Sequence, residues 1–169
     1  MNSKDEHPFI IGVDGGGSKV TAGIIEKYDD VFCLNKLFSN RYYIENPEFD
    51  TGFSPVGMGN QLRELQANEI KPATAEIAQG KSIINSFRDV ILDLNINSPV
   101  LIGIGMVGLK TSDNRGIGAM ANGPRMPEFC AHLEQLLQEE NIGLKYPISQ
   151  LGSDADYCGI GEEYGDGGM

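Results

Sequence analysis

The N-terminal part of the chain alternates between apolar and polar residues in three short runs. Phe9 to Asp14, Val20 to Lys27 and Val31 to Phe38 are rich in β-branched and aromatic residues, and Gly15–Gly17 and Asp29–Asp30 separate them. Strands joined by such short turns pair with their neighbours in antiparallel order. The pattern therefore predicts a three-stranded meander.

The spacing of apolar residues then changes. Residues 39–71 hold turn-forming pairs such as Asn46-Pro47 and predict a long irregular insertion, with a short helix around residues 61–66. Apolar residues recur at helical spacing from about Ala73 to Leu94, which predicts a long amphipathic helix. The unbroken apolar run from Pro99 to Met106 is typical of a strand that is covered on both faces.

The C-terminal part repeats this order of helix and strand. The segment from Pro127 to Gly143 predicts a second long helix, and residues 147–151 predict a fifth strand. Ser153 can cap a last helix over residues 154–164. A meander followed by two strand–helix crossovers is the arrangement of a ribonuclease H-like lobe. We therefore expect an α/β fold in one lobe over residues 1–169, with flanking helices on a five-stranded mixed sheet.

Composition excludes several classes of protein. The net charge is −11, and no cluster of Lys and Arg is present that could follow a nucleic-acid backbone. The longest apolar run is much shorter than the ~20 residues of a membrane span, and the polar N-terminus has no signal-peptide core. Three cysteines, which lie far apart, predict neither a disulfide framework nor a zinc site. We therefore expect a cytoplasmic protein without nucleic-acid or membrane partners.

Glycine is unusually frequent, with 22 of 169 residues, and occurs in short clusters. The first cluster, Gly15–Gly17, follows Asp14 and precedes Ser18 and Lys19. It nearly matches a P-loop, but Ser and Lys are swapped, and a strand follows where a P-loop opens a helix. Backbone N–H groups of such glycines can approach phosphate oxygens, and Asp14 can hold hydrated Mg²⁺. The alternative is a hairpin turn without a ligand.

Two further clusters follow predicted strands. The segment Gly103–Gly108 matches G-x-G-x-x-G, but a loop is expected over residues 110–122, where a dinucleotide-binding motif would have begun its helix. Glycines that admit a ligand or allow close packing fit this place better. In the segment Gly152-Ser153-Asp154, the acid begins a helix directly after a strand and is expected to point into the same crevice as Asp14. Simple capping of the helix is the alternative.

These segments together resemble those of a known family. The run from Ile10 to Lys19 resembles the phosphate-1 motif of the actin/hexokinase/heat-shock ATPase superfamily. The segments Gly103–Gly108, Asn122–Pro124 and Ser153–Glu162 resemble, in this order, three motifs of the ROK (repressor, open reading frame, kinase) sugar kinases. Within the superfamily, the glycine triplet also resembles N-acetylglucosamine kinases and BadF-type ATPases.

The resemblance implies the N-terminal lobe of a sugar kinase that uses ATP and Mg²⁺ to phosphorylate a hexose or N-acetylhexosamine. Asp154 would be the general base that takes the proton of the sugar hydroxyl. The remaining implied roles are sugar contacts at Asn122, Gly123 and Gly108, phosphate contacts at Gly15, Gly16, Gly17, Ser18 and Lys19, and a water-mediated Mg²⁺ contact at Asp14.

The chain also departs from the family. Val107 stands where the family has proline, and Ser153 and Asp156 stand where it has asparagine. The family's second lobe, with its adenosine site and Cys/His zinc motif, is not among these 169 residues. We therefore expect a lobe that is inactive alone and pairs with a missing C-terminal lobe or a second copy. The alternatives are a non-catalytic sugar-sensing ROK regulator, a BadF- or N-acetylglucosamine-kinase-type ATPase, and a ligand-binding lobe with a separately encoded partner.

Overall fold

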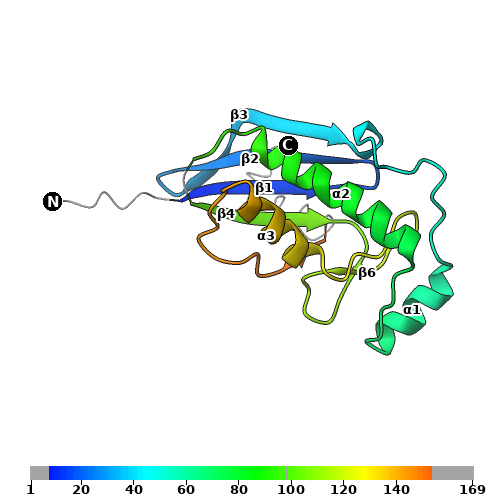
Figure 1. The fold of residues 1–169 in the computed structure, drawn as a ribbon. Helices are drawn as coiled ribbons and strands as arrows, with labels where there is room; N and C mark the ends of the chain where they lie inside the picture. The colour runs from blue at the N-terminus through cyan, green and yellow to red at the C-terminus, as the bar shows by residue number, and fades with distance from the viewer. Residues whose placement is uncertain (1–7, 98, 154–169) are drawn as a thin grey trace, which may run out of the picture.

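A five-stranded mixed sheet organises the molecule (Figure 1). The computed structural model describes residues 8–97 and 99–153. In chain order the elements are β1 (Phe9–Gly15), β2 (Lys19–Tyr28), β3 (Val31–Tyr42), the 3₁₀ turn η1 (Tyr43–Glu45), α1 (Met58–Gln66), α2 (Thr74–Leu92), β4 (Val100–Met106), β5 (Leu109–Lys110), β6 (Ile117–Ala119), α3 (Phe129–Glu139) and β7 (Leu151–Gly152).

The strand order β3-β2-β1-β4-β7 confirms the predicted topology. The first three strands pair antiparallel, whereas β4 pairs with β1, and β7 with β4, in parallel. Helices α2 and α3 both lie in front of the sheet in Figure 1. They bury the inward residues of β1 and β2, and the Phe87 ring of α2 meets Phe129 of α3 edge-on at 4.9 Å between ring centroids.

Helix α2 has the limits that its sequence predicts. It begins two residues after Pro72, and the Glu76 carboxylate accepts a hydrogen bond from the Ala73 backbone N–H at 2.9 Å, which satisfies one of the free donors at the helix start. Its buried apolar residues recur at helical spacing, and the face that they form packs on the sheet.

The structure corrects several element boundaries. Strand β3 continues to Tyr42 because Arg41 and Tyr42 still pair with β2, so the predicted irregular insertion begins four residues too early. Helix α1 is longer than its predicted span of 61–66. Residues 109–119, predicted as loop, form the β5–β6 hairpin, and α3 begins two residues after Pro127.

The fifth strand is shorter than predicted. Strand β7 consists of Leu151 and Gly152, which pair with β4, although the sequence predicts a strand over residues 147–151. The backbone N–H of Ile148 instead donates to the Glu134 side chain of α3 at 2.7 Å, and its carbonyl accepts from Arg115. Side chains have thus replaced the strand's backbone partners. The last predicted helix, 154–164, lies outside the described residues. Of the helices in residues 8–97 and 99–153, none is long and apolar enough to cross a membrane.

Candidate functional site

The glycine cluster forms a tight hairpin between β1 and β2. Gly15 pairs with Val20, and the Gly16 N–H donates to the Lys19 carbonyl at 2.9 Å. A Cβ atom at Gly15 would overlap with Phe87 Cζ, so the close approach of β1 to α2 requires a glycine there. At Gly17 a Cβ atom would meet no heavy atom within 4 Å, which leaves the tip of the hairpin open to a ligand.

Tyr43 fixes the shape of this hairpin, although no sequence motif marks it for this role. Its backbone N–H donates to the Ser18 carbonyl and its phenol O–H to the Gly16 carbonyl, both at 2.9 Å. The ring is buried and stacks with Phe87. Burial, with a smaller contribution from the negative charge of Asp14, raises the pKa of the phenol above its ordinary value. Tyr43 therefore remains a neutral hydrogen-bond donor to the hairpin at physiological pH.

The ends of three strands lie in one row across the sheet. Asp14 pairs with Thr21 of β2 on one side and with Gly105 of β4 on the other, and Gly105 pairs with Gly152 of β7. Residues that pair across strands point to the same face. The exposed Asp14 carboxylate thus shares a row with the end of β7. Asp154 follows two residues later in the sequence but lies outside the described residues, so its meeting with Asp14 stays a prediction.

The G-x-G-x-x-G segment connects the hairpin to the predicted sugar-binding loop. The Val107 N–H donates to the Gly15 carbonyl at 3.2 Å. Gly108 has φ +98°, and a Cβ there would lie 2.8 Å from the Ala119 carbonyl oxygen of β6. No helix starts inside the segment, because β5 follows it at Leu109. Gly108 therefore serves a turn and close packing, and the strand that follows it agrees with the expectation that the segment is no dinucleotide-binding motif.

Asn122 and Gly123 lie on the loop that follows β6. Asn122 is exposed, whereas Gly123 is buried, and a Cβ there would lie 2.6 Å from Met120 Sδ. The structure therefore brings Gly15, Gly108 and β6 into one continuous set of contacts, and the loop of Asn122 extends from it.

Arg125, at the end of this loop, is not among the predicted site residues. Its side chain is 1% exposed and donates through Nε and Nη2 to the two carboxylate oxygens of Glu76, at 2.9 and 2.7 Å, and through Nη1 to Glu64. The hydrogen bonds that the guanidinium donates to Glu76 raise its pKa. Burial opposes ionisation of Glu76, but its hydrogen bonds from Arg125 and from the Ala73 N–H leave the pKa of that carboxyl below its ordinary value. Arg125 and Glu76 therefore both stay charged at neutral pH.

Asp14 is the described residue that best fits the implied magnesium ion. It is an exposed carboxylate beside a glycine hairpin with an open tip, and Mg²⁺ prefers oxygen ligands while keeping several waters. Among residues 8–97 and 99–153, no three His, Cys, Asp or Glu side chains come together as a metal cage. An ion held by water and by the phosphates of a nucleotide would need no such cage.

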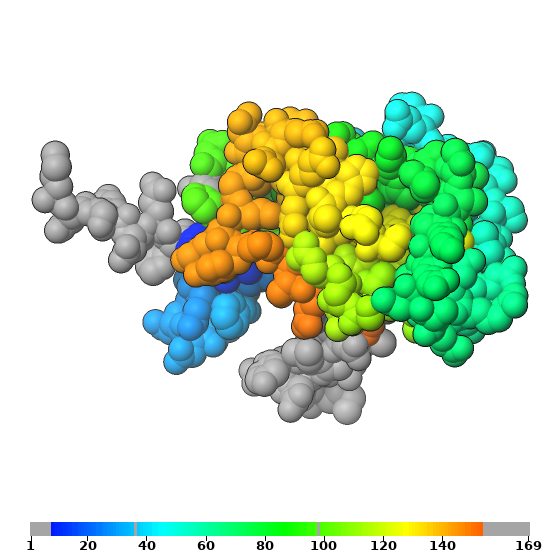
Figure 2. All heavy atoms as spheres, turned by 60° about the horizontal axis from the view of Figure 1, so that its bottom comes forward, coloured from blue at the N-terminus to red at the C-terminus, as the bar shows by residue number. Residues whose placement is uncertain are grey.

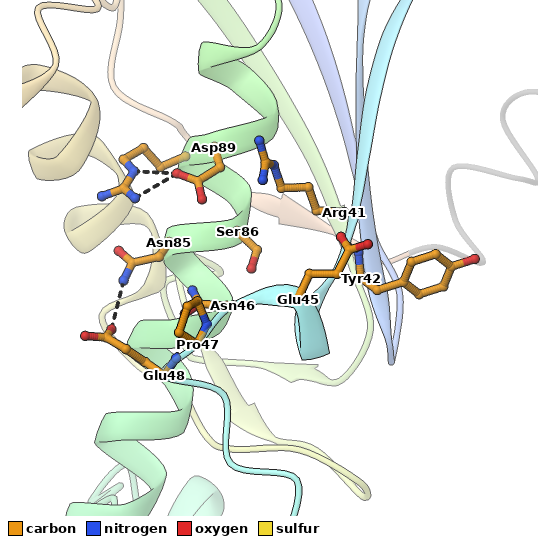
Figure 3. A pocket seen from close by; sticks show the side chains of 10 residues that line it. Arg41, Tyr42, Glu45, Asn46, Pro47, Glu48, Asn85, Ser86 and Asp89 are labelled. Carbon is orange, nitrogen blue, oxygen red and sulfur yellow. Dashed lines mark hydrogen bonds and ion pairs between the residues drawn. The ribbon is translucent and has the colours of Figure 1, made fainter.

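A separate hollow of about 420 Å³ lies between the end of β3, η1 and the C-terminal half of α2 (Figure 3). Its charges already have partners: Arg88 pairs with Asp89 at 2.7 Å, and Asn85 donates to Glu48 at 3.5 Å. None of the residues predicted for phosphate, metal or sugar binding lines it. The hollow is therefore distinct from the candidate site at the strand ends.

No protein-family model and no curated protein matches the chain. Among solved structures, the chain is similar to the inorganic polyphosphate/ATP-glucomannokinase of Arthrobacter sp. strain KM, with a TM-score of 0.55 and 18% identity over 96% of this chain and 51% of that one. A Ppx/GppA family member from Aquifex aeolicus matches with a TM-score of 0.37 and 11% identity, over 96% of this chain and 41% of that one.

The chain thus spans about half the length of the glucomannokinase. At this level of identity the likeness concerns the fold, and it agrees with the observed strand order and with the placement of α2 and α3. The described residues therefore have a ribonuclease H-like fold, with a glycine hairpin and an exposed acid at the ends of its central strands.

Proposed function

We propose that the chain is the N-terminal lobe of a kinase that transfers the γ-phosphoryl group of ATP to a hydroxyl of a hexose or N-acetylhexosamine. The observation that carries the proposal is the row of strand ends, in which Asp14 lies beside the glycine hairpin and in register with the end of β7. Phosphoryl transfer depends mainly on positioning and charge stabilisation, and this row offers both at one edge of the sheet.

Each residue has a defined task in this proposal. The backbone of Gly15–Gly17, with Ser18 and Lys19, surrounds the phosphates of ATP. Asp14 holds the hydrated Mg²⁺, which neutralises charge on the phosphates when it is bound. The fixed form of the hairpin supports this task, because Tyr43 holds two of its carbonyls and leaves its tip open.

The sugar is assigned to the loop beyond β6. Asn122 supplies a side-chain amide at an exposed position, and Gly108 and Gly123 allow the chain to pack tightly around it. Asp154 is proposed as the general base that accepts the proton of the attacking hydroxyl. We further propose that a second lobe closes over this edge of the sheet, since this chain spans about half of the glucomannokinase that it resembles.

The test compares Asp154→Asn with Asp14→Asn in the natural protein, using an ADP-release assay over hexoses and N-acetylhexosamines. Asp154→Asn should lower kcat by on the order of 10²–10⁴ with little change in the KM for sugar, because the amide keeps the shape but cannot accept the proton. Asp14→Asn should raise the KM for ATP and the Mg²⁺ requirement together, with partial rescue at high Mg²⁺.

Two outcomes would contradict the proposal. If Asp154→Asn kept its full kcat and only lowered the melting temperature, the acid would be a helix cap and no base. If the natural protein bound a sugar of the panel but released no ADP with any of them, the non-catalytic regulator would be the better description.

A further inference from the structure

One face of helix α1 is turned towards the β5–β6 hairpin and the loop that carries Asn122. Gln61, Glu64 and Leu65 lie at positions i, i+3 and i+4, a spacing that places them on one side of the helix, and Asn68 follows just beyond the helix end. We call these four residues the α1 clamp. Figure 1 shows α1 beyond the edge of the sheet near β6, and in the space-filling view the teal α1 region meets the yellow-green segment around residues 105–120 (Figure 2).

Gln61 makes the most specific contact of the α1 clamp. Its side chain is fully buried, which is unusual for glutamine. The side-chain Oε1 accepts a hydrogen bond from the Met120 N–H at 2.8 Å, and Nε2 donates to the Met120 carbonyl at 3.2 Å and to the Val56 carbonyl at 2.6 Å. One amide thus binds both backbone groups of the residue two positions before Asn122.

The other members hold the segments on either side of Asn122. Gly118 of β6 packs so closely on α1 that a Cβ there would overlap with Leu65 Cδ1. Asn68 accepts a hydrogen bond from Ser112 Oγ at 3.0 Å, and Glu64 pairs with Arg125, three residues after Asn122. The loop is therefore held at both ends, while Asn122 itself stays exposed.

We infer that the α1 clamp is a positioning device for the sugar, in which Gln61 fixes the Met120 backbone so that Asn122 is presented to the substrate in one conformation. The inference rests on the proposed role of Asn122 as the sugar contact. A loop that is already ordered loses less conformational freedom on binding, so the clamp should act on the affinity for sugar. The clamp itself contacts β6 and the loop, and it is joined to the glycine hairpin through β6, Gly108 and Val107, so the affinity for Mg²⁺-ATP should depend on it far less than the affinity for sugar.

The experiment uses Gln61→Met, which keeps the volume of the side chain but removes its hydrogen bonds. Gln66→Ala is the control, because Gln66 lies exposed on the same helix. Leu65→Ala is a milder second variant of the same face, in case Gln61→Met does not fold. For each, backbone amide hydrogen exchange is measured at Met120 and Asn122. Dissociation constants for glucose, mannose, N-acetylglucosamine and Mg²⁺-ATP are measured well below the melting temperature.

We expect faster amide exchange at Met120 and Asn122 in Gln61→Met, and about tenfold weaker binding of whichever sugar of the panel the wild type binds. Leu65→Ala should show the same changes to a smaller extent. The dissociation constant for Mg²⁺-ATP should stay within twofold of the wild-type value in every variant, and Gln66→Ala should match the wild type throughout.

The outcomes separate this inference from the proposed function. Unchanged amide exchange at Met120 in both clamp variants, or sugar and ATP affinities that fall together, would overturn the positioning role while the kinase proposal stands. If the wild type binds none of the sugars although exchange at Met120 responds to Gln61→Met, the sugar assignment of Asn122 fails, and the positioning role for sugar fails with it.

Discussion

The glycine hairpin and the loop of Asn122 are held in place by different kinds of interaction. The hairpin is stabilised by backbone carbonyls that accept from one neutral residue, Tyr43, and by close packing of Gly15 on Phe87. The loop of Asn122 is stabilised by side chains of distant segments, among them the buried charges of Arg125 and Glu76 and the buried amide of Gln61.

This difference predicts how each region responds to substitution. A neutral hydrogen bond contributes only ~0.5–1.5 kcal/mol, and water can replace it at a partly exposed carbonyl. A buried charge that loses its partner has no such replacement, and breaking a buried pair costs roughly 3–5 kcal/mol. We therefore expect the hairpin to tolerate the loss of single hydrogen bonds, whereas the loop should be sensitive to the loss of a single charge.

The largest effect is expected for Arg125→Met, which keeps the apolar volume but leaves Glu76 buried without its partner. The free energy of unfolding should fall by about 3–5 kcal/mol, as measured by chemical denaturation at pH 7. Arg63→Met is the matched control, because Arg63 is exposed on α1 and its side chain donates to groups of its own helix; it should change stability by at most about 0.5 kcal/mol.

The pH profile of the same variant sharpens the prediction. In the wild type the pKa of Glu76 is lowered, so its contribution to stability is complete above the unfolded-state value of ~4.3 and is lost as the pH falls through the folded-state value. In Arg125→Met burial remains without the partner and should raise that pKa. The variant should therefore recover stability relative to the wild type between pH 7 and pH 4, and a constant difference across this range would contradict the role of the buried pair.

The hairpin and the loop of Asn122 also differ in how well the sequence predicts them. Tight turns and apolar spacing are local, and they predict the meander, the limits of α2 and the glycine hairpin. The pair of Arg125 and Glu76 joins residues 49 positions apart, and Gln61 and Met120 are 59 apart. No feature of the sequence around Arg125 or Gln61 indicates which distant residue it will contact. The sequence therefore places the polar residues of α1 in an irregular insertion and does not predict their contacts with the loop of Asn122.

The length of β7 is a second feature that the sequence does not predict. Residues 147–150 are part of the predicted fifth strand, but Glu134 and Arg115 bind the backbone of Ile148 in place of a neighbouring strand. The role of Tyr43 escapes sequence analysis because its two bonds to the hairpin depend on the continuation of β3 to Tyr42. In both cases the deciding hydrogen bonds join residues that are distant in the sequence.

A second, smaller effect should separate two neighbouring glycines of the hairpin. In Gly15→Ala the new methyl group would overlap with Phe87 and Met106, so the free energy of unfolding should fall by about 1–3 kcal/mol. Gly17→Ala meets no atom within 4 Å and should leave stability within about 0.5 kcal/mol. The methyl group of Gly17→Ala would lie where the phosphates are proposed to bind, so the affinity for Mg²⁺-ATP should fall. Equal stability of the two variants in chemical denaturation would show that the hairpin is not packed as described.

The smallest effect is expected for Tyr43→Phe, which removes the hydrogen bond to the Gly16 carbonyl but keeps the ring stacked on Phe87 and the backbone bond to Ser18. Because Gly16 is only partly buried, water can bind its carbonyl, and the free energy of unfolding should fall by about 0.5–1 kcal/mol. Tyr42→Phe is the matched control, since Tyr42 is 50% exposed, and it should not change stability measurably. Chemical denaturation of both variants measures the difference. A loss as large as that in Arg125→Met would mean that a neutral bond at the hairpin has the same weight as the buried charges at the loop, and the contrast between the two regions would be wrong.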